Sequence, residues 1–269
     1  MDTEKEISGR KLSRELLKER WYRRRYLVPN AVTIGNMFCG FLAIMYSATN
    51  RYEKAALAIG IAILLDGLDG RVARRLNATS KFGLEFDSFS DLISFGVAPA
   101  ILLYHWCFFP QADEFGVAVT FVYVICAASR LARFNIAAEN LKSFVGCPTP
   151  GAAGFVAALV NFAPRVQSSF MLQVFGTIVM VSLAYLMVSR IEFFSVKRLK
   201  LSGMRLFARI ALGALIALIW YNSGFGFLVL ASAYVLSGPY GFVKRRNSPP
   251  AQMPGKVVQL AENSQPHDR

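Results

Sequence analysis

Charged residues are scarce in this chain, and histidine is almost absent. Asp, Glu, Lys and Arg make up 17% of its 269 residues, whereas a soluble globular domain contains about 25%. Together with a hydrophobic fraction of 54%, this deficit argues against a soluble protein and favours a polytopic membrane protein. Neither His105 nor His267 is expected to be catalytic. The four cysteines match no metal-ligand spacing, which argues against a zinc site, and we interpret them as small buried hydrophobic residues: Cys39, Cys107, Cys126 and Cys147.

Long apolar runs replace the missing charge. A membrane-spanning helix needs about 20 mostly apolar residues, and we expect eight such segments. They lie near residues 29–48, 53–72, 84–105, 115–134, 150–166, 170–189, 206–222 and 224–243. The fifth is short and rich in Gly and Ala, a composition that suits close helix packing. The sequence therefore predicts an all-α polytopic membrane bundle: a transmembrane domain at 29–243, a basic segment at 1–28 that could form an interfacial helix, and a disordered tail at 244–269.

Positive charge is concentrated in alternate connections between these segments. Residues 1–28, 71–82, 130–150, 189–209 and 243–269 hold nine, four, three, six and five Lys or Arg residues, 27 of the 30 in the chain. Such connections face the cytoplasm in membrane proteins. We therefore expect both termini to be cytoplasmic, in a multi-pass protein of the cytoplasmic (inner) membrane. The net charge of +13 suits acidic lipid headgroups or phosphate-bearing substrates.

Four aspartates lie within this apolar sequence, in the stretch DGLDGRVARRLNATSKFGLEFDSFSD: Asp66, Asp69, Asp87 and Asp91. Each aspartate at the centre of a spanning helix costs about 2.5–3.5 kcal/mol on insertion scales, so a compensating charge is expected. Carboxylate oxygens favour Mg²⁺, Mn²⁺ or Ca²⁺. Four carboxylates are enough to hold two ions, and two ions clamp a diphosphate well. The alternative interpretation is a structural polar network between helices.

Helical spacing places these aspartates on two facing stripes. Residues three and four apart share a helix face, so one stripe comprises Asp66, Asp69, Gly70, Ala73 and Arg74. A second stripe comprises Gly83, Asp87 and Asp91. Because the connection between the segments is short, we expect the two helices to be antiparallel neighbours with their stripes facing a small polar cavity. The glycines leave room for a bulky group, and phosphate oxygens would meet the nearby cations Arg74, Arg75 and Lys81.

The pattern Asp66-x2-Asp69-Gly70-x2-Ala73-Arg74-x8-Gly83-x3-Asp87-x3-Asp91 resembles the full signature of the CDP-alcohol phosphotransferase family, with all eight residues at the family's spacing. Members transfer a phosphatidyl or similar phosphoryl group from a CDP-linked lipid to an alcohol and release CMP. The resemblance implies that the first three aspartates are metal ligands and that Asp91 is both a ligand and the general base. It also implies that Gly70 and Gly83 make room for the nucleotide, that Arg74 contacts phosphate, and that the protein is a homodimer.

Two further regions narrow the expected substrates. Asn30, Thr33 and Asn36 recur at spacing three in the first apolar segment, where polar residues either join helices or line a site; we include them with Ala73 and Lys81 among the residues expected at the CDP-lipid. The stretches ASRLARFN and FVGCPTPGAAG are similar to the membrane-embedded branch of the family that uses CDP-diacylglycerol and L-serine. The carboxylate of serine needs a cation, for which the candidates are Arg130, Arg133 and Lys142, and we favour Arg133.

The sequence also leaves other functions open. Within the same chemistry the acceptor could be glycerol 3-phosphate, inositol phosphate or choline, which the aspartate signature does not distinguish. An intramembrane prenyltransferase also uses Asp-rich motifs with Mg²⁺, but usually on well-separated helices. A cation transporter would place its carboxylates near the midplane, between repeats or on broken helices. No internal repeat is evident, and these aspartates cluster at one face.

Overall fold

The computed structural model describes residues 30–76, 80–109, 114–137, 146–167, 169–189, 191, 193 and 222–246. The expected seventh segment, the basic N-terminal segment and most of the C-terminal tail lie outside the described residues, as does Lys142. The backbone of Ala73, Arg74 and Lys81 is described, but their side chains are not.

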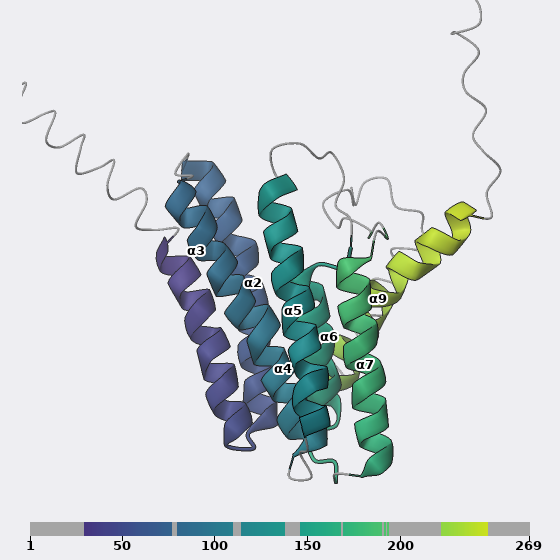
Figure 1. Ribbon diagram of the computed structural model, residues 1–269. Helices are drawn as coiled ribbons and strands as arrows, with labels where there is room; N and C mark the ends of the chain where they lie inside the picture. The colour runs from purple at the N-terminus through teal and green to yellow at the C-terminus, as the bar shows by residue number, and fades with distance from the viewer. Residues whose placement is uncertain are drawn as a thin grey trace, which may run out of the picture.

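The described part of the chain is helical and contains no strand (Figure 1). Five helices are long and apolar enough to cross a membrane: Asn30–Ala48, Phe82–Phe108, Glu114–Ile136, Phe170–Val188 and Ser223–Phe242. The expected all-α membrane class is therefore confirmed. Two other expected segments coincide with helices that do not meet this criterion. The second includes Asp66, Asp69 and the arginines that follow them, and the fifth is an apolar helix of only 14 residues, Thr149–Phe162.

The first two described helices form an antiparallel pair. The N-terminal helix, Asn30–Ala48, ends in a tight turn in which Asn50 has a positive φ of 56°, a conformation that asparagine tolerates better than most residues. Helix α2, Tyr52–Leu76, then carries the chain back toward the end where the N-terminal helix began. Tyr52 closes the turn, because its hydroxyl oxygen lies 2.8 Å from Asn50 Oδ1 and 2.9 Å from the His105 carbonyl oxygen, and its single proton can be donated to either.

The third expected segment is one long helical rod whose hydrogen-bond pattern changes along its length. It comprises α3 (Lys81–Asp91), the π-helical η1 (Leu92–Val97), α4 (Ala98–Leu103) and the π-helical η2 (Tyr104–Phe108). Pro99 has no N–H to donate to the carbonyl of Phe95, four residues earlier. The buried hydroxyl of Tyr123 donates to that carbonyl instead, at 3.1 Å. Widened π turns often occur at functional sites, and η1 begins directly after Asp91.

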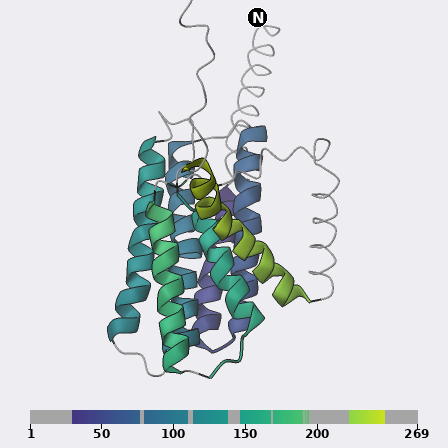
Figure 2. The same ribbon diagram turned by 90° about the vertical axis from the view of Figure 1, so that its right-hand side faces the viewer.

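The remaining helices complete the bundle: α5 (Glu114–Ala137), α6 (Thr149–Phe162), α7 (Phe170–Val188) and α9 (Ser223–Arg246). Helix α5 packs along α7, while α6 packs between α2 and α9, which is inclined to the other helices (Figures 1 and 2). Small residues permit this close packing. Ala152, Ala153 and Ala157 of α6 are buried in the core, and a Cβ at Gly151 would lie 2.5 Å from the ring of Tyr234. The Gly- and Ala-rich fifth segment therefore packs as its composition indicates.

A glycine turn brings the start of α6 beside the end of α7. Gly146 has a φ of +89°, and a Cβ there would lie 2.5 Å from the Met187 carbonyl oxygen, so glycine is required both by conformation and by space. Its N–H donates to Ile191 O at 2.8 Å, and that of Cys147 donates to Leu186 O at 2.9 Å. These bonds hold the GCPTPG stretch against the C-terminal end of α7.

Candidate active site

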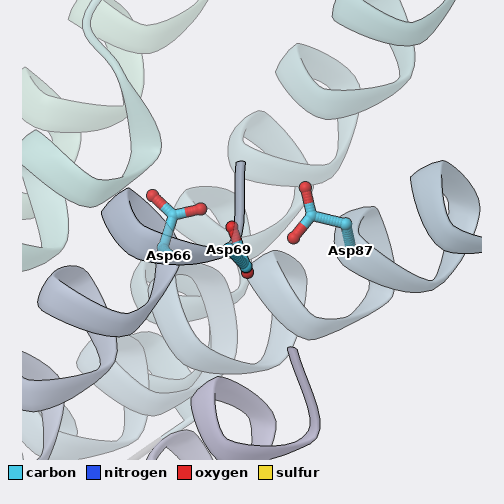
Figure 3. Close-up of side chains that lie close together, drawn as sticks. All are labelled: Asp66, Asp69 and Asp87. Carbon is cyan, nitrogen blue, oxygen red and sulfur yellow. The ribbon is translucent and has the colours of Figure 1, made fainter. Parts of the chain in front are cut away.

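Three of the four aspartates converge at one end of the bundle. Asp66 and Asp69 lie one turn apart on α2, and Asp87 faces them from α3 (Figure 3). One carboxylate oxygen from each lies within 4.8 Å of the other two. Because α2 ends at Leu76 and α3 begins at Lys81, the chain reverses direction directly beyond these residues and brings the two stripes together. The predicted convergence of Asp66 and Asp69 with Asp87 is therefore confirmed.

The surroundings of this cluster fit a bound cation. Asp69 is only 5% exposed, and its Oδ2 atom and Oδ1 of Asp87 are buried without a hydrogen-bond partner in the described structure. No described Lys or Arg side chain forms an ion pair with any of the four aspartates. Buried carboxylate oxygens without donors are costly, and hard divalent cations bind such all-oxygen sets. The cluster is therefore a site that could hold a metal ion.

Asp91 lies one turn further along α3 than Asp87 and is not part of the three-carboxylate cluster. It remains within electrostatic reach of Asp66, Asp69 and Asp87. Its Oδ1 atom accepts a hydrogen bond from Asn36 Nδ2 at 3.4 Å. The structure therefore places Asp91 beside the candidate metal centre, where it could act on a group bound there.

Polar residues of the N-terminal helix line the same end of the molecule. Asn30 lies beside Gly83, where its Oδ1 atom would be 3.6 Å from an added Cβ. Thr33 is buried, and its carbonyl accepts a hydrogen bond from Ser90 Oγ at 3.2 Å. The three polar positions of this helix therefore face the segment that carries the aspartates, which their spacing alone did not specify.

Arg130 and Arg133, one turn apart on α5, have different surroundings. Arg130 is mostly buried, lies within electrostatic reach of Asp91, and donates from Nη1 to Thr149 Oγ1 at 3.5 Å. Its Nε atom is buried without a hydrogen-bond partner in the described structure. Arg133 is exposed and donates to the carbonyl of Val188 at the end of α7, at 3.2 Å. The geometry thus favours Arg130 over Arg133 as a cation for a ligand near Asp91.

Sequence reasoning missed two residues, one beside the aspartate motif and one beside Arg130. Asn135, in the RLARFN stretch, exchanges hydrogen bonds of 3.0 and 3.2 Å with Ser88, the neighbour of Asp87, and so joins α5 to α3. Tyr234 of α9 packs on Gly151 at the start of α6 and lies within electrostatic reach of Arg130. For Asn135, the available signal was a polar residue beside each of the two motifs: Ser88 next to Asp87, and Asn135 itself in the RLARFN stretch. Nothing local in the sequence marks Tyr234, which lies over 100 residues from Arg130.

Comparison with known proteins supports an assignment for this site. Residues 26–188, which include all eight motif residues, match the family model described as CDP-alcohol phosphatidyltransferase. Three relatives are each named CDP-diacylglycerol–serine O-phosphatidyltransferase. That of Helicobacter pylori strain J99 is 39% identical over 180 residues, covering 65% of this chain and 75% of the relative. That of Bacillus subtilis strain 168 is 39% identical over 166 residues, covering 62% and 89%. That of Methanocaldococcus jannaschii is 34% identical over 171 residues, covering 64% and 75%.

Proposed function

The chain belongs to the CDP-alcohol phosphatidyltransferase family, and we propose that it transfers the phosphatidyl group of CDP-diacylglycerol to the hydroxyl of L-serine, releasing CMP and forming phosphatidylserine. The observation that carries this proposal is the convergence of Asp66, Asp69 and Asp87, all members of the family's motif, within 4.8 Å. The names of the bacterial and archaeal relatives support serine as the acceptor. The protein is then a transferase of phospholipid biosynthesis.

We propose Mg²⁺ or Mn²⁺ as the cofactor, held by Asp66, Asp69, Asp87 and Asp91, with enough carboxylates for two ions. The unpartnered buried oxygens of Asp69 and Asp87 support this assignment. When bound, the metal neutralises charge on the diphosphate and on the departing CMP. The protein's own contribution is to bring three of these carboxylates, from α2 and α3, within 4.8 Å of one another.

The CDP-lipid is proposed to bind along the same stripes. The residues assigned to it are Asn30, Thr33, Gly70, Ala73, Arg74, Lys81 and Gly83. The position of Asn30 beside Gly83 supports a shared role for the N-terminal helix and α3. We do not extend this role to Asn36, because its side chain is fully buried and faces Asp91.

Asp91 is proposed as the general base. It takes the proton of the serine hydroxyl as the oxygen attacks the phosphorus of the phosphatidyl group. A new P–O bond to serine forms while the P–O bond to CMP breaks, and CMP leaves with the electron pair. The position of Asp91 one turn beyond Asp87, where Asn36 bonds to its carboxylate and the other three aspartates are within electrostatic reach, supports a role in proton transfer.

The serine carboxylate is proposed to bind Arg130. Its burial, its unpartnered Nε atom and its proximity to Asp91 support this choice. Arg133 and Lys142 remain secondary candidates, and Arg133 already donates to the Val188 carbonyl. With Arg130 at its carboxylate and Asp91 at its hydroxyl, serine would be held at two points.

The finer membrane arrangement is also a proposal. We propose eight transmembrane helices over residues 29–243, both termini and the active site at the cytoplasmic face of the inner membrane, a basic segment at 1–28, and a disordered tail at 244–269. The distribution of Lys and Arg supports this orientation. The family resemblance supports a homodimer. Reaction of single-cysteine variants with a membrane-impermeant thiol reagent, applied from each side of the membrane, tests the orientation.

The decisive experiment measures CMP release by the purified protein from CDP-diacylglycerol, with Mg²⁺ or Mn²⁺, across a panel of alcohols. We expect release that requires both metal and L-serine, with phosphatidylserine as the lipid product. Release with glycerol 3-phosphate, inositol phosphate or choline instead would keep the family chemistry and discard serine. If the folded protein releases no CMP with any alcohol, the proposed reaction is contradicted, and a prenyltransferase or a cation transporter is favoured instead.

A further inference from the structure

Asn36 lies within the N-terminal helix, and its side chain is 0% exposed. Its Nδ2 atom is 3.4 Å from Asp91 Oδ1. Because an ionised carboxylate can only accept hydrogen bonds, the amide nitrogen must be the atom that faces Asp91. We propose that Asn36 is a positioning residue for Asp91, holding the carboxylate in the orientation in which it receives the proton of the acceptor alcohol. This inference rests on the proposed role of Asp91 as the general base.

The backbone around Asn36 is fastened to the segment that carries Asp91. Ser94 Oγ donates to the carbonyl of Asn36 itself at 3.0 Å, and Ser90 Oγ donates to the carbonyl of Thr33 at 3.2 Å. A Cβ at Gly40 would lie 2.7 Å from the Cα of Ser94, so the two backbones approach as closely as glycine allows. These contacts flank Asp91 on both sides. The amide of Asn36 is therefore presented to the carboxylate from a fixed backbone.

Two observations argue against simpler roles for Asn36. First, its Oδ1 atom is buried without a hydrogen-bond partner in the described structure. A residue that served only to join helices would be expected to satisfy both ends of its amide, because an unpaired buried carbonyl costs free energy. Second, a side chain without exposed surface is not available to contact the donor lipid. The contact of 3.4 Å is long, as catalytic hydrogen bonds often are before the substrate binds.

The inference predicts a defect in turnover without a defect in binding. Asn36→Leu keeps the approximate size of the side chain and removes the N–H donor. We expect kcat to fall by about 10- to 100-fold, as for other residues that orient a catalytic ligand. The KM for the alcohol and the Kd for CDP-diacylglycerol should stay within about twofold, because an interaction used only in the transition state affects kcat alone. Donor binding, measured by calorimetry, is a readout independent of turnover.

Ser47→Ala provides the matched control. It removes a buried hydrogen bond in the same helix, from Ser47 Oγ to the Ala43 carbonyl at 2.7 Å, but that bond involves neither Asn36 nor Asp91, so kcat should stay within about twofold. Thermal unfolding is measured on every variant. If Asn36→Leu does not fold, Asn36→Ala replaces it, with the same expected fall in kcat and an unchanged Kd for CDP-diacylglycerol.

Three outcomes would overturn the inference. An increase of tenfold or more in the Kd for CDP-diacylglycerol, with kcat unchanged, would make Asn36 a donor-binding residue. Equal losses of kcat in Asn36→Leu and Ser47→Ala, with equal losses of stability, would reduce Asn36 to a packing residue. Wild-type kcat in Asn36→Leu would remove any role in turnover. All variants are assayed with the alcohol that the wild-type protein uses, so failure of the serine assignment appears in the wild type and leaves this test intact.

Discussion

The two ends of the helical bundle use their polar groups in opposite ways. At the end where α2 meets α3, buried oxygens of Asp69 and Asp87 have no hydrogen-bond partner in the described structure. At the other end, Tyr52 and Trp106 donate to the carbonyls of His105 and Ala163 at 2.9 and 2.8 Å, although Nδ1 of His105 stays unpaired. Tyr52 and Asp66 lie 14 residues apart on α2, which corresponds to about 21 Å.

This difference distinguishes groups that stabilise the fold from groups kept for a ligand. Tyr52 and Trp106 each satisfy a backbone carbonyl that secondary structure leaves free, so their bonds close the bundle at that end. Asp69 Oδ2 and Asp87 Oδ1 have no such partner, so their burial costs free energy until a cation binds. We therefore expect substitutions at the aspartate end to alter activity and metal binding more than stability, and substitutions at the other end to do the reverse.

Asp91→Asn tests the aspartate end most strongly. The variant keeps the size of the side chain but removes the base, and general base catalysis typically contributes about 10²- to 10⁴-fold. We expect CMP release to fall by at least this factor while binding of CDP-diacylglycerol partly survives. Glu85→Gln, an exposed change on the same helix, should leave the rate close to that of the wild type. Appreciable turnover by folded Asp91→Asn would contradict the role of Asp91.

Asp69→Asn tests whether the cluster holds the metal. Loss of residues that only orient metal ligands costs about 10- to 100-fold in affinity, and loss of a ligand itself should cost at least as much. We expect the Kd for Mn²⁺ to rise by at least about tenfold, together with the Mn²⁺ concentration needed for half-maximal activity. The Kd is measured by titration of the protein without substrate. An unchanged Kd would place the metal elsewhere.

Arg130→Ala and Arg133→Ala compare two cations one turn apart on α5. Hydrogen bonds to charged groups contribute about 1.5–3 kcal/mol, so loss of Arg130 should raise the KM for L-serine by roughly 10- to 100-fold. Arg133 is exposed and bonded to the Val188 carbonyl, so its loss should change this KM by less than about threefold. Steady-state kinetics at saturating CDP-diacylglycerol measure both. A larger rise in the KM for L-serine in Arg133→Ala than in Arg130→Ala would assign the serine carboxylate to Arg133 instead.

Trp106→Phe tests the opposite end and should have the smallest effect on activity. The change removes the indole N–H that donates to Ala163 O at 2.8 Å. A typical hydrogen bond contributes about 0.5–1.5 kcal/mol to stability, so a modest fall in the unfolding temperature in detergent is expected, with CMP release unchanged. Loss of CMP release without loss of stability would show that the two ends are not separate in function.

Much of the fold could be predicted because membrane insertion imposes strong constraints on sequence. Eight apolar runs of the required length were expected, and seven of them coincide with helices in the part of the chain that the structure describes. Two helices do not meet the criterion for a membrane span. Helix α2 has 25 residues but carries charged residues within its apolar sequence, and α6 has only 14 residues. The motif aspartates could be paired from helical spacing, because both their helices are regular and the connection between them is short.

The sequence by itself determined the helical class, the polar end of the bundle and the meeting of Asp66 and Asp69 with Asp87, because these depend on local periodicity and chain connectivity. Only the tertiary structure decided which arginine turns inward, that Asn36 faces Asp91, that Asn135 bonds to Ser88, and that Tyr234 packs on Gly151. Each of these depends on contacts between residues on different helices. Their separation in the sequence ranges from 19 residues, between Arg130 and Thr149, to more than 100, between Arg130 and Tyr234. Such contacts depend on how the helices rotate and pack against one another, which the local spacing of residues does not determine.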